Sequence, residues 1–177
     1  MIEIEVKVTL NKEEKEEVVR RLNSFGEFVG VYVEEDVFFK CLRDPSYGRE
    51  KTLKLRRRDD KIKLIFKHRV PSKEFKKSLE IEVELIGSDL KSILQLLEYL
   101  GFKESMTIKK KRLTYRMGDC LINLDDVEGL GSFIEIEIIA GEEDAHAKIR
   151  ELLSRLGLLG KELINRSYAE IIREKTA

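Results

Sequence analysis

The fold is decided by the first strand-like stretch, Ile2-Glu3-Ile4-Glu5-Val6-Lys7, in which apolar and charged residues alternate without a break. Successive side chains of a strand point to opposite faces, so one face of this strand is apolar and the other carries two carboxylates and an ammonium group. The same alternation returns at residues 81–85 (Ile-Glu-Val-Glu-Leu) and at residues 134–138 (Ile-Glu-Ile-Glu-Ile). A chain that repeats a charged strand face in this way is expected to use that face.

Each of these strands is followed by a helical pattern that ends near a glycine, at Gly26, Gly101 and Gly157. Strand, helix and glycine therefore form a degenerate repeat. Alternating segments between the repeats predict further strands. In all, the sequence predicts eight strands, over about residues 2–9, 29–39, 51–58, 61–68, 79–86, 105–117, 119–125 and 133–139, and four helices, over about residues 12–24, 88–100, 142–156 and 160–174.

Most neighbouring strands can pair antiparallel, so the predicted class is α+β, mainly antiparallel β. Two architectures fit the two-faced strands: an open sheet with its charged face in water, or a sheet rolled up with the charged face inward and the helices outside. Closure is favoured because it removes unpaired sheet edges, and eight strands suffice for a small barrel. We therefore expect a single domain over residues 1–177, an eight-stranded closed tunnel barrel with a charged interior and helices packed outside.

The charge balance limits the classes of partner. The chain has 34 basic and 34 acidic residues, and 38% of all residues are charged, well above the usual quarter. Net neutrality gives no electrostatic footprint for nucleic acid or for an anionic membrane, so neither partner is expected. Abundant Lys, Arg and Glu, a single Gln and no Trp are typical of a thermophile's protein.

The cysteines and the hydropathy pattern indicate a cytoplasmic protein. Cys41 and Cys120 provide neither a disulfide framework nor metal-ligand spacing, and a buried, inert thiol is expected for each. No signal peptide precedes the first strand, and no apolar run approaches membrane length.

The charged strand faces together indicate a chemistry. They hold Glu3, Glu5, Lys7, Lys54, Arg56, Lys67, Glu80, Glu82, Glu84, Lys110, Arg112, Asp125, Glu135 and Glu137. An interior with so many charges has to be a hydrated tunnel, because unpaired buried charge is costly. Carboxylate clusters suit Mg²⁺ or Mn²⁺, and several Lys and Arg suit a multiply charged oxyanion. Metal-holding carboxylates beside a set of cations are what a triphosphate needs.

The sequence resembles the CYTH, or triphosphate tunnel metalloenzyme, superfamily, and the resemblance covers essentially the whole chain. Glu3-x-Glu5-x-Lys7 matches the family's ExExK signature. Ser167-Tyr168-Ala169-Glu170 resembles the SYxE tail of its class IV adenylyl cyclase branch. The family's other motifs follow in the same order, as Asp36-Val37-Phe38-Phe39 (DxYF), Leu53-Lys54-Leu55-Arg56 (LRxR, with Lys in place of the first Arg), Lys67, Glu80-x-Glu82, Lys110-x-Arg112 and the stretch LDDVEGLGSFIEIE at 124–137.

The resemblance implies roles for these residues. One or two divalent metals, Mg²⁺ or Mn²⁺, would be held by Glu3, Glu5, Asp125, Glu135 and Glu137. The triphosphate would be held by Lys7, Lys54, Arg56, Lys67, Lys110 and Arg112. The catalytic set would be Glu3, Glu5, Lys7 and Asp125, with Glu80 and Glu82 in support. Lys54 keeps the charge of the family's arginine but loses its bidentate fork. Tyr168 is expected to pack or cap rather than to take part in the chemistry.

Several functions fit this sequence. The leading hypothesis is a class IV-like adenylyl cyclase, which converts ATP to cyclic AMP and pyrophosphate. The alternative is a triphosphatase that hydrolyses inorganic, thiamine or nucleoside triphosphate in the same tunnel. A non-catalytic binder of ATP or polyphosphate is a third hypothesis, and a domain whose charges serve only as thermophilic ion pairs is a fourth. Resemblance to the cyclase branch also implies a homodimer.

Overall fold

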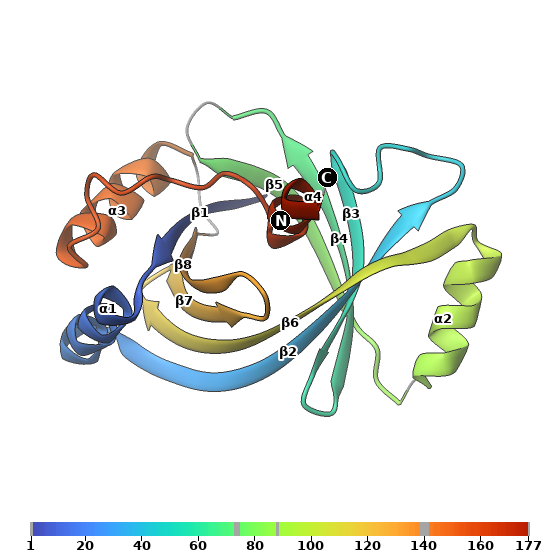
Figure 1. The fold of residues 1–177 in the computed structure, drawn as a ribbon, viewed down its shortest axis with the longest axis horizontal. Helices are drawn as coiled ribbons and strands as arrows, with labels where there is room; N and C mark the ends of the chain where they lie inside the picture. The colour runs from blue at the N-terminus through green and yellow to red at the C-terminus, as the bar shows by residue number, and fades with distance from the viewer. Residues whose placement is uncertain (1, 73–74, 88, 139–141, 177) are drawn as a thin grey trace.

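The computed structural model describes residues 2–72, 75–87, 89–138 and 142–176. Its centre is a closed barrel in which every neighbouring pair of strands is antiparallel (Figure 1). The strands are β1 (Ile2–Leu10), β2 (Glu27–Cys41), β3 (Lys51–Arg58), β4 (Lys61–Val70), β5 (Lys76–Glu84), β6 (Phe102–Met117), β7 (Cys120–Val127) and β8 (Gly131–Ile138). Around the barrel they follow the order β1-β5-β4-β3-β2-β6-β7-β8. The predicted closed eight-stranded barrel is therefore confirmed.

β1 closes the barrel because it pairs with two strands that are distant in sequence. Glu3 lies opposite Ser78 of β5, and Lys7 lies opposite Glu135 of β8. The apolar residues of β1 point away from the cavity into the largest core, where Ile4, Val6 and Val8 are buried. The alternation of residues 2–7 therefore places its charged face inward, because its apolar face packs against the helices outside.

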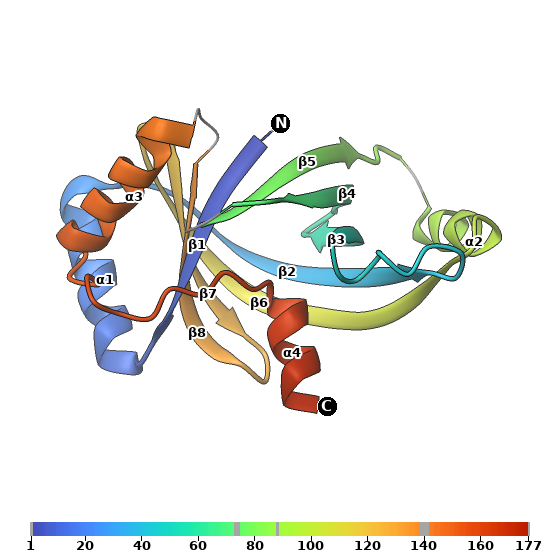
Figure 2. The same ribbon diagram turned by 90° about the horizontal axis from the view of Figure 1, so that it is seen from above.

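The helices are α1 (Lys12–Phe25), α2 (Leu90–Tyr99), α3 (Glu142–Arg155) and α4 (Tyr168–Thr176). Figure 2 shows α1 and α3 on one side of the barrel and α2 on the opposite side. Val18 and Leu22 of α1 and Ile149 of α3 bury their side chains against the outer faces of β1, β7 and β8. Leu97 of α2 packs over β2 and β3 in a second core. None of the helices in the described ranges is long and apolar enough to cross a membrane.

The chain before α4 differs from the predicted helix over residues 160–174. Gly157 and Gly160 have positive φ angles of 74° and 88°, which end the preceding helix and redirect the chain. Ile164 then pairs with Lys7, with Ile164 N to Lys7 O at 2.8 Å. The pairing satisfies backbone groups of β1 beyond Glu5, where the described register with β5 ends. Helix therefore begins only at Tyr168.

Two smaller differences concern β5 and the segment before α2. The strand begins at Lys76 rather than at residue 79, and it ends at Glu84 rather than at residue 86. Asp89 is the N-cap of α2, accepting hydrogen bonds from the backbone N–H groups of Lys91 and Ser92. The predicted helix start at Ser88 and strand end at Ile139 lie outside the described residues.

The core outside the barrel gives a first prediction. Ile136 of β8 is fully buried among β1, β7 and the helices. Ile136→Ala is expected to lower the free energy of unfolding by about 2–5 kcal/mol, because it removes methyl groups and leaves a cavity. Urea denaturation measures the change. Ile136→Val is the control, with an expected loss of about 0.5–1.5 kcal/mol, and equal effects of the two variants would contradict this account of the core.

Candidate functional site

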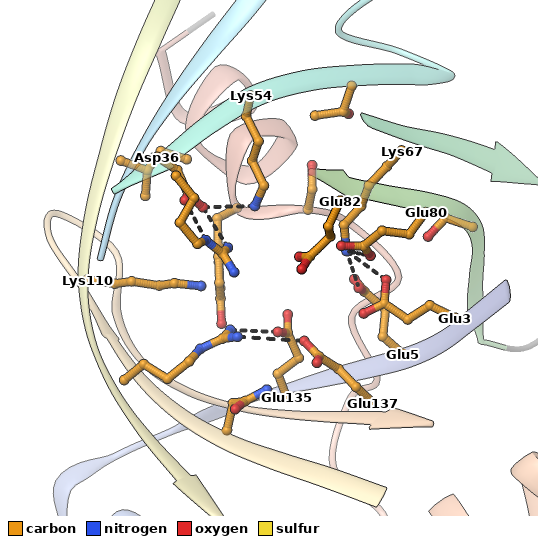
Figure 3. Close-up of a pocket in the computed structure, with 18 of the residues that line it drawn as sticks. Glu3, Glu5, Asp36, Lys54, Lys67, Glu80, Glu82, Lys110, Glu135 and Glu137 are labelled. Atoms are coloured by element: carbon orange, nitrogen blue, oxygen red, sulfur yellow. Dashed lines mark hydrogen bonds and ion pairs between the residues drawn. The ribbon is translucent and has the colours of Figure 1, made fainter. Parts of the chain in front are cut away.

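The barrel encloses a cavity of about 440 Å³ that receives side chains from every strand. Among the described residues, thirteen Lys or Arg and ten Asp or Glu line it. Opposite charges are thus mixed throughout, with an excess of cations that favours an anionic ligand. Figure 3 shows acidic side chains, including Glu3, Glu5 and Glu80, on one side of the cavity and Asp36, Lys54 and Lys110 on the other.

Three carboxylates on the acidic side lie close enough to share one cation. Glu3 and Glu5 of β1 and Glu137 of β8 each offer an oxygen atom, and the three oxygen atoms lie within 4.8 Å of one another. β1 and β8 bring them together because Glu5 lies directly opposite Glu137 in the register. Hard carboxylate oxygen atoms are the ligands that Mg²⁺ and Mn²⁺ prefer. The donor set, here called the acidic cluster, therefore fits a divalent metal of this kind.

The pKa values of the acidic cluster reflect its crowding. Burial raises the pKa of Glu3 to about 8, and neighbouring Glu5 and Glu80 add to the rise while Lys67 opposes it. Burial and the adjacent Glu135 also hold the pKa of Glu137 well above its usual range. Burial acts in the same direction on Glu5, but nearby lysines outweigh it and keep the pKa of Glu5 low. Negative charge in the cluster is therefore only partly balanced by the protein.

Lysines provide the partial balance. Lys7 Nζ lies 2.5 Å from Glu5 Oε1 and 2.6 Å from Glu135 Oε2. Lys76 Nζ lies 2.6 Å from the same Glu5 oxygen. Lys67 Nζ lies 2.7 Å from Glu3 and 2.6 Å from Glu80. Like the acidic cluster, Lys7, Lys67 and Lys76 line the cavity, so their ammonium groups can also reach a phosphate oxygen.

The opposite side is a cationic wall, defined here as Lys54, Arg56, Arg58, Lys110 and Arg112. Buried carboxylates of β2 and β7 hold its members in place. Asp36 accepts a bond from Lys54 at 2.9 Å and two from Arg56 at 2.7 and 2.8 Å. Burial lowers the pKa of Lys54 to about 8, and the neighbouring Arg56 contributes to the shift. An anion that enters the cavity would favour the charged form of Lys54 and raise its pKa again.

Asp125 lies among the cations and not in the acidic cluster. Arg112 donates to both of its oxygens, at 2.7 and 2.6 Å, and Tyr168 donates its hydroxyl hydrogen at 2.9 Å. Lys110 Nζ lies 3.4 Å away. Arg112 also donates to Glu135 at 2.7 Å, so it connects Asp125 to Glu135, which lies beside the acidic cluster. In this arrangement Asp125 positions cations.

All the residues that sequence reasoning nominated line this cavity except Asp125, which is fully buried behind Arg112 and Tyr168. Glu80 and Glu82 of β5 also line the cavity, where Glu82 pairs with Lys63 at 2.8 Å. Sequence reasoning did not nominate Lys76, Glu34 or Arg58, and it expected Tyr168 only to pack. Glu34 lies two residues from Asp36 in β2, and Arg58 lies two residues from Arg56 in β3. Residues two apart share a strand face, and this was the available signal for Glu34 and Arg58. No local signal pointed to Lys76, which lies before the predicted strand over residues 79–86.

The fold and the site define a class of protein, an eight-stranded antiparallel barrel whose cavity opposes clustered carboxylates to a cationic wall. The family model of the CYTH domain matches residues 1–168 of the chain. The chain belongs to the CYTH domain family.

One relative with sequence similarity matches nearly the whole chain, and another matches about half of it. A Methanocaldococcus jannaschii protein named "Putative adenylate cyclase" is 31% identical over 176 residues, which cover 97% of this chain and 98% of the relative. An Aeromonas hydrophila adenylate cyclase is 30% identical over 91 residues, 49% of this chain and 48% of the relative. A solved structure from Pyrococcus horikoshii superposes with a TM-score of 0.82 at 32% identity, covering 98% of this chain and 99% of that one.

The acidic cluster predicts metal binding. Glu3→Gln and Glu137→Gln are each expected to weaken Mn²⁺ binding at least about tenfold, because each removes an anionic ligand. Calorimetry in a phosphate-free buffer measures the affinity. Glu84→Gln is the matched control, since Glu84 also lines the cavity but its side chain is 41% exposed and pairs with Lys61. An equal loss in all three variants would refute a localised metal site.

The hydroxyl of Tyr168 gives a prediction for stability. Tyr168→Phe keeps the ring, which packs on Phe133, but removes the hydrogen bond to the buried carboxylate of Asp125. A loss of about 1.5–3 kcal/mol in the free energy of unfolding is expected, as for bonds to charged groups. Tyr99→Phe is the control, because Tyr99 is 82% exposed. Indistinguishable denaturation curves for wild type and Tyr168→Phe would contradict the prediction.

Proposed function

We propose that this protein is a metal-dependent enzyme that acts on triphosphates in the barrel cavity, and that its reaction is the class IV-like cyclisation of ATP to cyclic AMP and pyrophosphate. One observation carries the proposal: the acidic cluster and the cationic wall face each other across a single cavity. A triphosphate with its metal presents the complementary arrangement, several anionic oxygens with a divalent cation beside them.

In this proposal the carboxylates bind the metal and the cations bind the phosphates. Glu3, Glu5 and Glu137 hold Mg²⁺ or Mn²⁺, with Glu135 adjacent through its contacts to Lys7 and Arg112. When bound, such a metal supplies Lewis-acid stabilisation of phosphoryl oxygens. The cationic wall binds the phosphate chain and stabilises the negative charge that develops on it, with Arg56 and Arg112 donating through N–H groups that their bonds to Asp36 and Asp125 do not use.

Cyclisation requires that the ribose 3′-oxygen attack the α-phosphorus, that the bond from this phosphorus to the β-bridging oxygen break, and that the 3′-hydroxyl proton leave. The products are cyclic AMP and pyrophosphate. Cations that already bind the β- and γ-phosphates stabilise pyrophosphate as the leaving group. The choice of this reaction is supported by the adenylate cyclase names of the Methanocaldococcus and Aeromonas relatives.

A triphosphatase is the second candidate, and the composition of the cavity wall favours it. Among the described lining residues the aliphatic and phenylalanine side chains are few, namely Val29, Phe38, Ile108 and Leu121, and they belong to three different strands. Cations lie over the rings of the two tyrosines in the lining, Tyr32 and Tyr168. Such a wall offers many contacts to phosphates and few to an organic group. Water would then attack the γ-phosphorus of inorganic, thiamine or nucleoside triphosphate. Binding of ATP or polyphosphate without turnover is the remaining alternative.

Product analysis separates these functions. The protein is incubated with ATP, and separately with tripolyphosphate, in Mg²⁺ or Mn²⁺ at elevated temperature, and the products are resolved by chromatography. Cyclic AMP with pyrophosphate is the expected result. Orthophosphate with ADP or pyrophosphate, without cyclic AMP, would refute the cyclase in favour of the triphosphatase. Absence of turnover with both compounds would refute an enzyme of either kind.

Adjacent lysines of β6 provide a matched pair of variants. Lys110 is buried and faces the cavity, whereas the side chain of Lys109 is 59% exposed on the outer face. Lys110→Gln is expected to lower kcat/KM on the order of a hundredfold, as for the loss of one stabilising charge in a transition state. Lys109→Gln is expected to change it by less than about twofold. Equal effects would show that the outer surface, not the cavity, is the site.

A further inference from the structure

Glu34 is a buried acid that the proposed mechanism does not use. It lies in β2, with Lys110 opposite on β6 and Arg58 opposite on β3. Its side chain is fully buried, and it lies behind the cations, outside the set of residues that line the cavity. The contacts come from the cationic wall: Arg58 bonds to Oε1, while Arg56 Nε and Lys110 Nζ lie 3.4 and 3.3 Å from Oε2.

The two oxygens of Glu34 differ from those of the other acids that hold this wall. Asp36 and Asp125 each accept a two-pronged bond from an arginine, which fixes that arginine geometrically. Among the described residues, Oε2 of Glu34 has no hydrogen-bond partner. It interacts with Arg56 and Lys110 through charge alone, at distances longer than those of the bonds to Asp36. Burial opposes its ionisation, but Arg56, Lys110 and Arg112 outweigh burial and keep its pKa low.

We propose that Glu34 limits how tightly the cavity holds a polyanion, by cancelling one positive charge of the cationic wall from behind. The proposal rests on the proposed function in taking this wall as the phosphate site. Because Glu34 is buried in a poorly polarisable environment and touches three of the five cations, its charge acts strongly on whatever those cations bind. A wall without this acid would hold both substrate and product phosphates more tightly.

The sign of the effect separates this role from a structural one. A residue that merely supports the cavity would weaken ligand binding when replaced. Glu34→Gln keeps the shape and removes only the charge, so it is expected to tighten binding of tripolyphosphate roughly fivefold or more. In the enzyme assay KM is expected to fall by a similar factor without a rise in kcat, because pyrophosphate is also held more tightly.

Calorimetry with tripolyphosphate in EDTA tests the proposal without metal or turnover. Glu35→Gln is the matched control, because the neighbouring Glu35 contacts Arg57 and Lys109 rather than the cationic wall. It is expected to bind as the wild type does. Glu34→Asp keeps the charge and is expected to stay within about twofold of the wild type. Tighter binding by Glu34→Gln alone supports the proposal, and unchanged or weaker binding overturns it.

Two failures can be told apart. If wild-type protein binds no tripolyphosphate, the cavity is not a phosphate site and both the proposed function and this inference are wrong. If wild type binds and Glu34→Gln binds equally or less tightly, only the inference is wrong.

A second pair of variants keeps the proposal testable if Glu34→Gln does not fold. Arg58→Gln removes one cation and is expected to weaken binding. The double variant Glu34→Gln/Arg58→Gln removes both members of the pair, so the net charge equals that of the wild type and no cation is left without its partner. Its affinity is expected to exceed that of Arg58→Gln roughly fivefold or more. A double variant that binds no better than Arg58→Gln overturns the proposal.

Discussion

Charge inside a closed barrel has to be compensated, and the rest of this structure depends on that constraint. Isolated ions in a poorly hydrated interior cost several kcal/mol each, so acids and bases must alternate around the cavity or share a hydrated space. Here neighbouring strands bring acids opposite bases, as with Lys7 and Glu135 or Asp36 and Arg56. The cavity stays charged because each buried group has a partner of opposite sign, and its excess of cations remains available to a ligand.

The same constraint explains why the helices lie outside. Turning the charged strand faces inward leaves the apolar faces outward, where α1 and α3 cover β1, β7 and β8, and α2 covers part of β2 and β3 (Figure 2). The largest part of the hydrophobic core therefore lies around the barrel. A smaller apolar cluster, which includes Phe38 and Ile108 of the cavity lining, packs against α4. Closure and helix packing are thus mutually dependent, because removing the helices would expose the apolar residues on the outer face of the barrel to water.

Partners of the charged groups are arranged at two levels. Glu5 and Glu3 form ion pairs with lysines that line the cavity, so a ligand or a metal can replace these contacts. Asp36 and Asp125 instead hold the cationic wall, and these contacts preorganise it. Tyr168 belongs to the second level, since its hydroxyl bonds Asp125 while Lys7 and Lys110 lie over its ring at 5.4 Å. A helix near the end of the chain thus completes the support of the site.

Sequence alone determined the barrel and most of its charged lining. Strict alternation indicates which residues share a strand face. The order of the motifs predicted that the charged faces, from Glu3 to Glu137, form one site. Only the tertiary structure decided which charges meet across the cavity. It separated Asp125 from the acidic cluster, added Lys76 and Glu34, and drew residues near Ile164 out of a predicted helix to pair with Lys7. The physical reason is that alternation is a local property of one strand, whereas partners depend on register and on how eight strands close.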